Sequence, residues 1–339
     1  MAGSLLAAAL LVWFFQAQWS QHAFDWKLAA GGIERLHWEW LALSLVPIFG
    51  TYWGRALRWA VFLKPLKERP SMRNLTVATI IGFAAITLFG RAGDFVRPYL
   101  IARKEEVPFS SQLAAWVLER IFDLLMASLL LGIALSRVRA AGLPVGSNLA
   151  WILAFGGRIV GCSCLAVLVM LLSLRHFAEP VRRRLTAAVR FLPESQFRRF
   201  EKLITALVKG VESTRSDGAL VLMFLYSVLE WVLIGACYWS LAQAFVGVIN
   251  LTFVDVIILM SFVSFGGVIQ IPGVGGGTQV VAILVLTELF RVRLELATGF
   301  AVLLWILTFV AIVPVGLGLA VKEGLDWHGL RQIGREAVQ

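Results

Sequence analysis

Charged residues are scarce in this chain. They make up 15% of its 339 residues, whereas hydrophobic residues make up 59%, and the mean hydropathy is +0.81. A soluble domain is usually about one quarter charged and less than half apolar. Several apolar runs also reach the roughly 18 residues that indicate a membrane span, without the alternation typical of a barrel. We therefore predict an all-α polytopic membrane protein.

Cysteine and histidine are rare too. The spacing of the three cysteines fits neither a metal site nor a disulfide scaffold; they are Cys162, Cys164 and Cys237. The four histidines all fall near the ends of predicted spans; they are His22, His37, His176 and His328. Because no nucleophile or metal-ligand pattern is visible, we predict no metal, no cofactor and no catalytic residue. We therefore expect this protein not to be an enzyme.

The net charge of +10 comes from basic residues between the apolar runs. The largest basic stretch is 175–217, which we predict to lie as one or two helices on the cytoplasmic membrane surface. Positive charge next to spans is typical of cytoplasmic loops that meet anionic lipid. We therefore expect anionic lipid to bind this segment, and we expect no nucleic-acid partner.

The topology follows from loop charge. The segments that predict full spans are 4–19, 38–63, 113–135, 149–174, 219–246 and 296–321. If 74–89 crossed the membrane completely, the basic stretch 175–217 would lie outside, against the positive-inside tendency. We therefore predict about six full transmembrane helices plus two re-entrant hairpins, 74–102 and 252–290, which enter from opposite sides. Both termini are then cytoplasmic, in a single domain over 1–339. The alternative is eight plain spans with unusual loop charges.

Several ionisable residues fall at membrane depth. Glu119 lies about nine residues into its predicted span, on the order of 14 Å at the helical rise and near mid-bilayer. A charge there costs at least a few kcal/mol unless it is paired or faces a wet cavity. We predict a positive, cytoplasm-facing cavity whose head-group-binding residues are Arg91, Asp94, Arg97, Glu119, Arg120, Asp123, Arg55 and Arg58. An ion-pair network that only joins helices is the alternative, as is snorkelling for Arg55 and Arg58.

Two further features lie outside that set. Glu230 is an isolated acid in the middle of its span, and we expect it to pair with Arg158. The second predicted hairpin has a glycine-rich tip, which favours either a gate that can also hold phosphate or simply close helix packing. The gating residues of this hairpin are predicted to be Pro272, Gly273, Gly275, Gly276, Gly277 and Gln279.

Two motifs carry a resemblance over nearly the whole chain. One reads Phe89-Gly-Arg91-Ala-Gly93-Asp94-Phe-Val-Arg97-Pro98, followed by Glu119-Arg120-Ile-Phe-Asp123. The other reads Pro272-Gly273-Val274-Gly275-Gly276-Gly277-Thr278-Gln279. These segments resemble the motifs of the lysylphosphatidylglycerol synthase transmembrane-region family, also called flippase-like domain proteins. Where members of that family carry proline, glutamate and glutamate, this chain carries Phe89, Asp94 and Gln279. The last change removes a carboxylate from the second motif.

The resemblance implies that the protein moves a lipid between leaflets. We expect a flippase of the cytoplasmic (inner) membrane, with Arg91, Arg97 and Arg120 as phosphate contacts and the acids as orienting groups. Replacing Arg97 or Arg120 with glutamine should then abolish transport without affecting folding. Only the short tail 322–339 follows the last span, so we expect no soluble aminoacyl-transferase domain. The alternatives are a non-catalytic partner of a lipid or polyprenyl-glycan biosynthesis enzyme and, third, a membrane-embedded head-group transferase.

Overall fold

The computed structural model describes residues 24–140, 217–266, 270–271 and 275–325, with single positions between 162 and 201. The predicted span 4–19, Pro272, Gly273 and most of the segments 149–174 and 175–217 lie outside these residues. The described chain is helical apart from one pair of two-residue strands. Its elements are α2 (Trp26–Glu34), α3 (Trp38–Leu63), α4 (Met72–Phe89), a 3-10 turn (Gly90–Phe95), α5 (Val96–Glu105), α6 (Phe109–Ala140), α10 (Asp217–Ala244), α11 (Phe253–Gly266), β1 (Gln270–Ile271), β2 (Gly275–Gly276), α12 (Gly277–Leu284), a π-helical turn (Val285–Leu289), α13 (Leu294–Trp305), a second π-helical turn (Ile306–Val310) and α14 (Ile312–Lys322).

The described chain contains four helical segments that are long and apolar enough to cross a membrane: Met72–Phe89, Phe109–Val138, Gly218–Ala244 and Leu294–Lys322. This confirms the prediction of a polytopic helical membrane protein. Helix α3 is also long, with 26 residues, but it is not one of the four. Its interior carries Arg55 and Arg58 among several aromatic residues, which lower its hydropathy.

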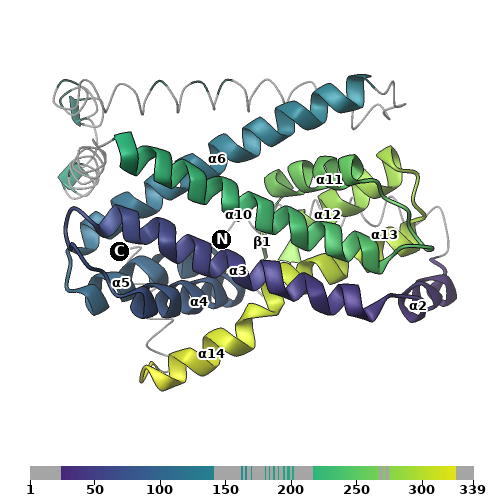
Figure 1. Ribbon diagram of the computed structural model, residues 1–339, viewed down its shortest axis with the longest axis horizontal. Helices are drawn as coiled ribbons and strands as arrows, with labels where there is room; N and C mark the ends of the chain where they lie inside the picture. Colours follow the sequence, from purple (N-terminus) through teal and green to yellow (C-terminus); the bar gives the residue numbers. More distant parts are fainter. Residues whose placement is uncertain are drawn as a thin grey trace.

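Helices α3 and α10 form the frame of the molecule. They run side by side along its long axis (Figure 1). Their directions are antiparallel, since the N–H of His37 at the start of α3 donates to the carbonyl of Ala244 at the end of α10, at 3.0 Å. The C-terminal end of α3 therefore lies at one end of this frame, and the C-terminal end of α10 lies at the other. One helical hairpin lies toward each end.

The first hairpin consists of α4, the 3-10 turn and α5. Helix α4 ends where Gly90 adopts a φ of 63°, a conformation that favours glycine. The two arms pack so closely that a Cβ added at Gly82 would lie 2.5 Å from the Cβ of Arg97. The arms also meet at their open end, where Asn74 Nδ2 donates to Glu105 Oε1 at 2.7 Å. The end of α5 therefore lies next to the start of α4, near the C-terminal end of α3.

Glu105 also binds the loop before α4. Its carboxylate lies 2.9 Å from Lys67 Nζ and accepts the backbone N–H of Ser71 at 3.2 Å. Burial raises the pKa of this carboxyl, but hydrogen bonds from Lys67, Asn74 and Ser71 outweigh burial and hold the pKa below its ordinary value. The ionised form therefore ties the open end of the hairpin together.

Replacing Glu105 with glutamine should lower the free energy of unfolding at pH 7 by about 1–3 kcal/mol, because charge-assisted hydrogen bonds are lost. A depressed pKa contributes stability above the unfolded-state pKa, and this contribution is lost as the pH falls through the folded-state pKa. The difference between wild type and Glu105→Gln should therefore shrink below about pH 4. Thermal unfolding in detergent at several pH values measures this. Glu106→Gln, at the exposed neighbouring position, is the control, and equal losses from both variants would contradict the assignment.

The second hairpin consists of α11, the strand pair and α12 with its π-helical turn. The strands pair antiparallel, Gln270 opposite Gly276. A Cβ at Gly266 would lie 2.5 Å from the carbonyl oxygen of Gly277, so the two arms touch through glycine. The first arm, α11, has 14 residues, which makes it about 21 Å long and shorter than a membrane core of about 30 Å.

The last apolar segment connects the two hairpins. Helix α13 packs against α12, and α14 packs against α4; a Cβ at Gly316 would collide with that of Ala84. Between α13 and α14 the chain makes the π-helical turn Ile306–Val310, where the N–H of Ala311 donates to the carbonyl of Ile306. Such turns are frequent at functional sites. The described hydrophobic core accordingly divides into two clusters, one around each hairpin.

Candidate functional site

Charged side chains from four helices meet inside the molecule, at the level where the first hairpin packs on the frame. Helix α3 supplies Arg55 and Arg58, which are three residues apart and share a face. Helix α6 supplies an acid pair four residues apart, and α5 and α10 add one charged residue each. The interacting set among the described side chains is Arg55, Arg58, Arg97, Glu119, Arg120, Asp123 and Glu230.

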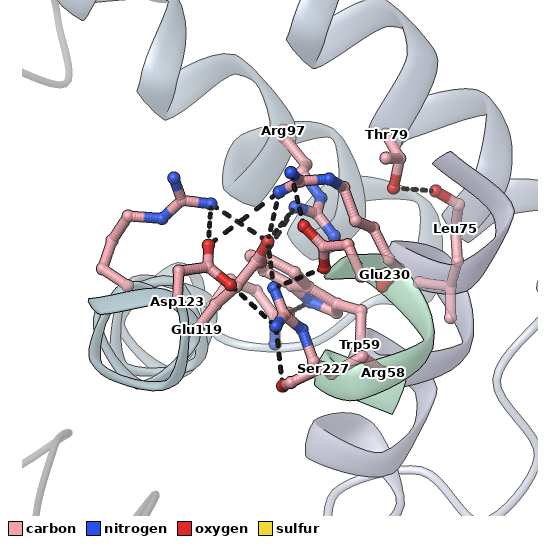
Figure 2. Close-up of polar contacts among 12 residues, drawn as sticks. Arg58, Trp59, Leu75, Thr79, Arg97, Glu119, Asp123, Ser227 and Glu230 are labelled. Carbon is pink, nitrogen blue, oxygen red and sulfur yellow. Dashed lines mark hydrogen bonds and ion pairs between the residues drawn. The ribbon is translucent and has the colours of Figure 1, made fainter. Parts of the chain in front are cut away.

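Glu119 is the centre of this set. Its side chain is fully buried, and four arginines converge on it (Figure 2). Arg97 Nη1 lies 3.0 Å and 2.9 Å from its two oxygens, and Arg58 Nη2 lies 2.8 Å from Oε1. Arg55 and Arg120 reach the same oxygen at 3.2 Å and 3.1 Å. One carboxylate thus holds α3, α5 and α6 together.

Arg97 is buried and contacts residues of three helices. Its guanidinium lies over the ring of Trp59, 4.0 Å from the ring centre, and Nη2 donates to the backbone carbonyl of Arg55 at 3.3 Å. Trp59 in turn donates to Gln112 Oε1 at 2.8 Å. These contacts fix Arg97 as the link between α5 of the first hairpin and the frame (Figure 2).

Glu230 joins the same cluster, which corrects the expectation that it is isolated from it. It lies 2.5 Å from Arg55 Nη2 and 3.2 Å from Arg58 Nη2. Arg158, its expected partner, lies outside the described residues. On the same face of α10, Ser227 Oγ accepts from Arg58 Nη1 at 2.9 Å. The sequence could show that Glu230 is an acid in the middle of a span. Only the packing of the helices shows which arginines it contacts.

A cavity of about 520 Å³ adjoins the cluster. Its walls come from α3, α4, the 3-10 turn, α6, α10, both arms of the second hairpin, and the π-helical turn and first residue of α14 in the last segment. Most of the lining is apolar or aromatic. The charged side chains that line it are Arg55, Asp94, Arg120, Asp123 and Glu230. A largely apolar pocket with a few convergent polar groups is the usual form of a ligand site.

The predicted head-group residues therefore separate into two groups. Arg55, Asp94, Arg120 and Asp123 line the cavity, and the Arg120 side chain is 43% exposed. Arg58, Arg97 and Glu119 lie behind them, are not part of the lining, and are almost fully buried. The side chain of Arg91 lies outside the described residues, so its place in the set stays a prediction.

The second hairpin contributes uncharged residues to the described cavity wall, namely Val263, Ser264, Phe265 and Thr278. Gln279 Oε1 accepts the N–H of Gly276 at 2.6 Å and so caps the start of α12. Gly277 provides the close contact with α11, and Gly275 is part of the strand pair. Their predicted role in gating stays a prediction. Thr278, which was not among the predicted site residues, lies where the hairpin meets the cavity.

The acidic residues of the cluster are arranged as partners of arginines. Within the described ranges, no group of three histidine, cysteine or acidic residues is arranged to hold a metal ion. The acids of the cluster are paired with arginines instead, beside a cavity whose lining is mostly apolar or aromatic.

The described chain is thus that of a polytopic helical membrane protein with two helical hairpins beside an internal cavity. The sequence comparison agrees: the chain belongs to the lysylphosphatidylglycerol synthase TM region family, whose match covers residues 1–316. A 104-residue segment is also 35% identical to glycosyltransferase AglD from Haloferax volcanii, covering 30% of this chain and 17% of that protein. The match therefore spans only a small part of the relative's length.

Proposed function

We propose that this protein translocates a lipid with a phosphate-bearing head group between the leaflets of the cytoplasmic membrane, without a covalent step. The observation that carries the proposal is the cavity between the two hairpins, which combines several charged residues with a largely apolar and aromatic lining. Arg120 and Arg55 would contact the phosphate. The apolar lining would accept the part of the lipid next to its acyl chains.

The arrangement of the hairpins supports the same proposal. The first opens toward the end of α3, because Glu105 binds residues at the start of α4. The second follows α10 from the opposite end of the frame. In the proposed topology both are re-entrant, from opposite sides, next to about six full spans with cytoplasmic termini. Paired broken helices that meet at a central site are typical of alternating-access transporters.

The buried arginines would act indirectly. Arg58 and Arg97 have their guanidinium groups directed to Glu119 and its neighbours, so they would position the cavity-lining charges rather than contact lipid. Arginine suits this role because its planar fork binds carboxylates at several points at once.

Reconstitution tests the proposed function. Vesicles that contain the purified protein and fluorescent NBD-phosphatidylglycerol should expose more than half of the probe to external dithionite, because inner-leaflet lipid reaches the outer leaflet. Protein-free vesicles should expose about half. If vesicles with the protein behaved like protein-free vesicles towards this probe, and also towards an NBD-labelled polyprenyl phosphate, the proposal would be wrong.

A second candidate is a non-catalytic membrane partner in lipid or polyprenyl-glycan biosynthesis. The partial likeness to a protein named a glycosyltransferase favours it. Stable co-purification of a biosynthetic enzyme, together with absence of transport in the same vesicles, would support this alternative over the first. Conversion of the head group by the protein alone would instead indicate a transferase.

A further inference from the structure

We propose that the cavity contains a second, uncharged subsite that binds a neutral hydroxyl-bearing part of the head group. Tyr52 of α3, Tyr238 of α10 and Thr278 of α12 form it. This inference rests on the proposed function and makes its substrate class more specific. The cargo would carry a phosphate next to a neutral polyol, such as glycerol or a sugar-like ring.

The three side chains are buried, line the same cavity and lack partners. They are 4%, 5% and 4% exposed. Within the described part of the chain, none of the three hydroxyl groups makes a hydrogen bond. The three hydroxyl oxygens are not among the fully buried unpaired atoms of the described chain, so they open onto the cavity. Three free hydroxyls from three helices can therefore bind an occupant that forms hydrogen bonds.

The other hydroxyl groups of the cavity wall behave differently. Thr51, Ser264 and Thr308 each donate to a carbonyl of their own helix at 2.6–2.7 Å, and Thr87 donates to the carbonyl of Phe309 at 3.1 Å. Their donor capacity is therefore already used. Among the uncharged donors of the described cavity wall, the three hydroxyls of the proposed subsite and the indole N–H of Trp116 are therefore left for a ligand. The indole N–H of Trp231 is also unpaired, but it is fully buried.

The subsite is displaced from the charged wall in one direction. Tyr52 lies three residues from Arg55 on α3, about 4–5 Å along the axis, and Tyr238 lies eight residues from Glu230 on α10, about 12 Å. Both displacements, from Arg55 to Tyr52 and from Glu230 to Tyr238, point toward the C-terminal end of α10. The second hairpin follows α10 from that end. Thr278 belongs to that hairpin. A phosphate at Arg55 and Arg120 would therefore place its polar substituent toward Tyr238 and Thr278.

The chemistry of the subsite suits a neutral polyol better than a second charge. Tyrosine and threonine hydroxyls both donate and accept hydrogen bonds, which matches alcohol groups on a ligand. Every described cavity-lining residue of the second hairpin is uncharged. A site built to bind ligand hydroxyls discriminates against analogues that lack them, because its own polar groups then stay unpaired.

A matched pair of lipids tests the inference. NBD-phosphatidylglycerol and NBD-phosphatidylethanol are both phosphodiesters with one negative charge, but only the first has free hydroxyls. The wild-type protein in vesicles should translocate phosphatidylglycerol at least about tenfold faster. The variants Tyr52→Phe, Tyr238→Phe and Thr278→Val each remove one hydroxyl, and each should reduce this ratio about two- to tenfold. NBD-phosphatidylinositol, as a third probe, distinguishes a ring polyol from glycerol.

The matched control is Thr308→Val, which removes a cavity-lining hydroxyl that is already bonded to Leu304; its ratio should equal that of wild type. The ratio of the two translocation rates separates lipid recognition from folding, because a variant that is only destabilised translocates both lipids more slowly to the same extent. Equal rates for both lipids in the wild type, or an unchanged ratio in the three variants, would overturn the subsite while leaving the proposed translocation intact. If the wild type moved none of the three lipids, the proposed function would itself fail for these phospholipids.

Discussion

Replacing Glu119 with glutamine is expected to lower the free energy of unfolding by about 3–5 kcal/mol, the usual cost of leaving a buried charge without its partner. Arg58 would keep Asp123 and Glu230, Arg55 would keep Glu230, and Arg120 would keep Asp123. Arg97 would keep none of the carboxylates it contacts among the described residues, because Glu119 is the one acid it pairs with there. Thermal unfolding of the detergent-purified protein measures the loss.

Two controls define what this loss means. Glu194→Gln removes a carboxylate that is 78% exposed and paired with Arg198, and it should leave the unfolding temperature unchanged because exposed ion pairs contribute little. The double variant Glu119→Gln with Arg97→Met removes the stranded charge as well, so it should be more stable than Glu119→Gln alone. If Glu119→Gln were as stable as wild type, the cluster would not be what joins these helices.

The sequence predicted the helices of this region closely, because apolar runs and their polar ends are local features. Helix α3 begins and ends where it was expected, at Trp38 and Leu63, and the first hairpin, predicted over 74–102, covers 72–105. Helix α6 is longer than its predicted apolar part, 113–135, because its polar ends continue the helix. Apolarity marks the membrane-embedded part of a helix, not where its hydrogen bonding stops.

The partners within the site could not be predicted in the same way. Arg97 and Arg120 look equivalent in the sequence, since each lies near an acid in an apolar segment. Their difference depends on rotation and packing: Arg97 faces Trp59 and is buried, whereas Arg120 faces the cavity. The place of Glu230 in the cluster depends on how α10 packs on α3, which no spacing within either helix reveals. The unpaired hydroxyls likewise come from three helices that are distant in sequence.

This difference changes what mutation of the two arginines should do. Arg97→Gln would remove a buried cation from Glu119 and Trp59, so we now expect it to destabilise the fold, unlike the expectation from sequence. Arg120→Gln should leave the fold stable, because Glu119 keeps Arg58 and Arg97, and Asp123 keeps Arg58. The unfolding temperatures of the two variants, measured side by side, should therefore differ clearly.

Arg120→Gln should nevertheless slow translocation of NBD-phosphatidylglycerol about 10- to 100-fold, because a hydrogen bond between a guanidinium and a phosphate contributes roughly 1.5–3 kcal/mol. Arg120→Lys should fall between this variant and wild type, since lysine keeps the charge but loses the fork. Arg103→Gln makes the same change in net charge at an exposed position of α5 and should transport normally. Normal transport by Arg120→Gln in the dithionite assay would remove Arg120 from the binding site. A matching loss in Arg103→Gln would instead point to the overall charge of the protein, because the two variants share nothing else.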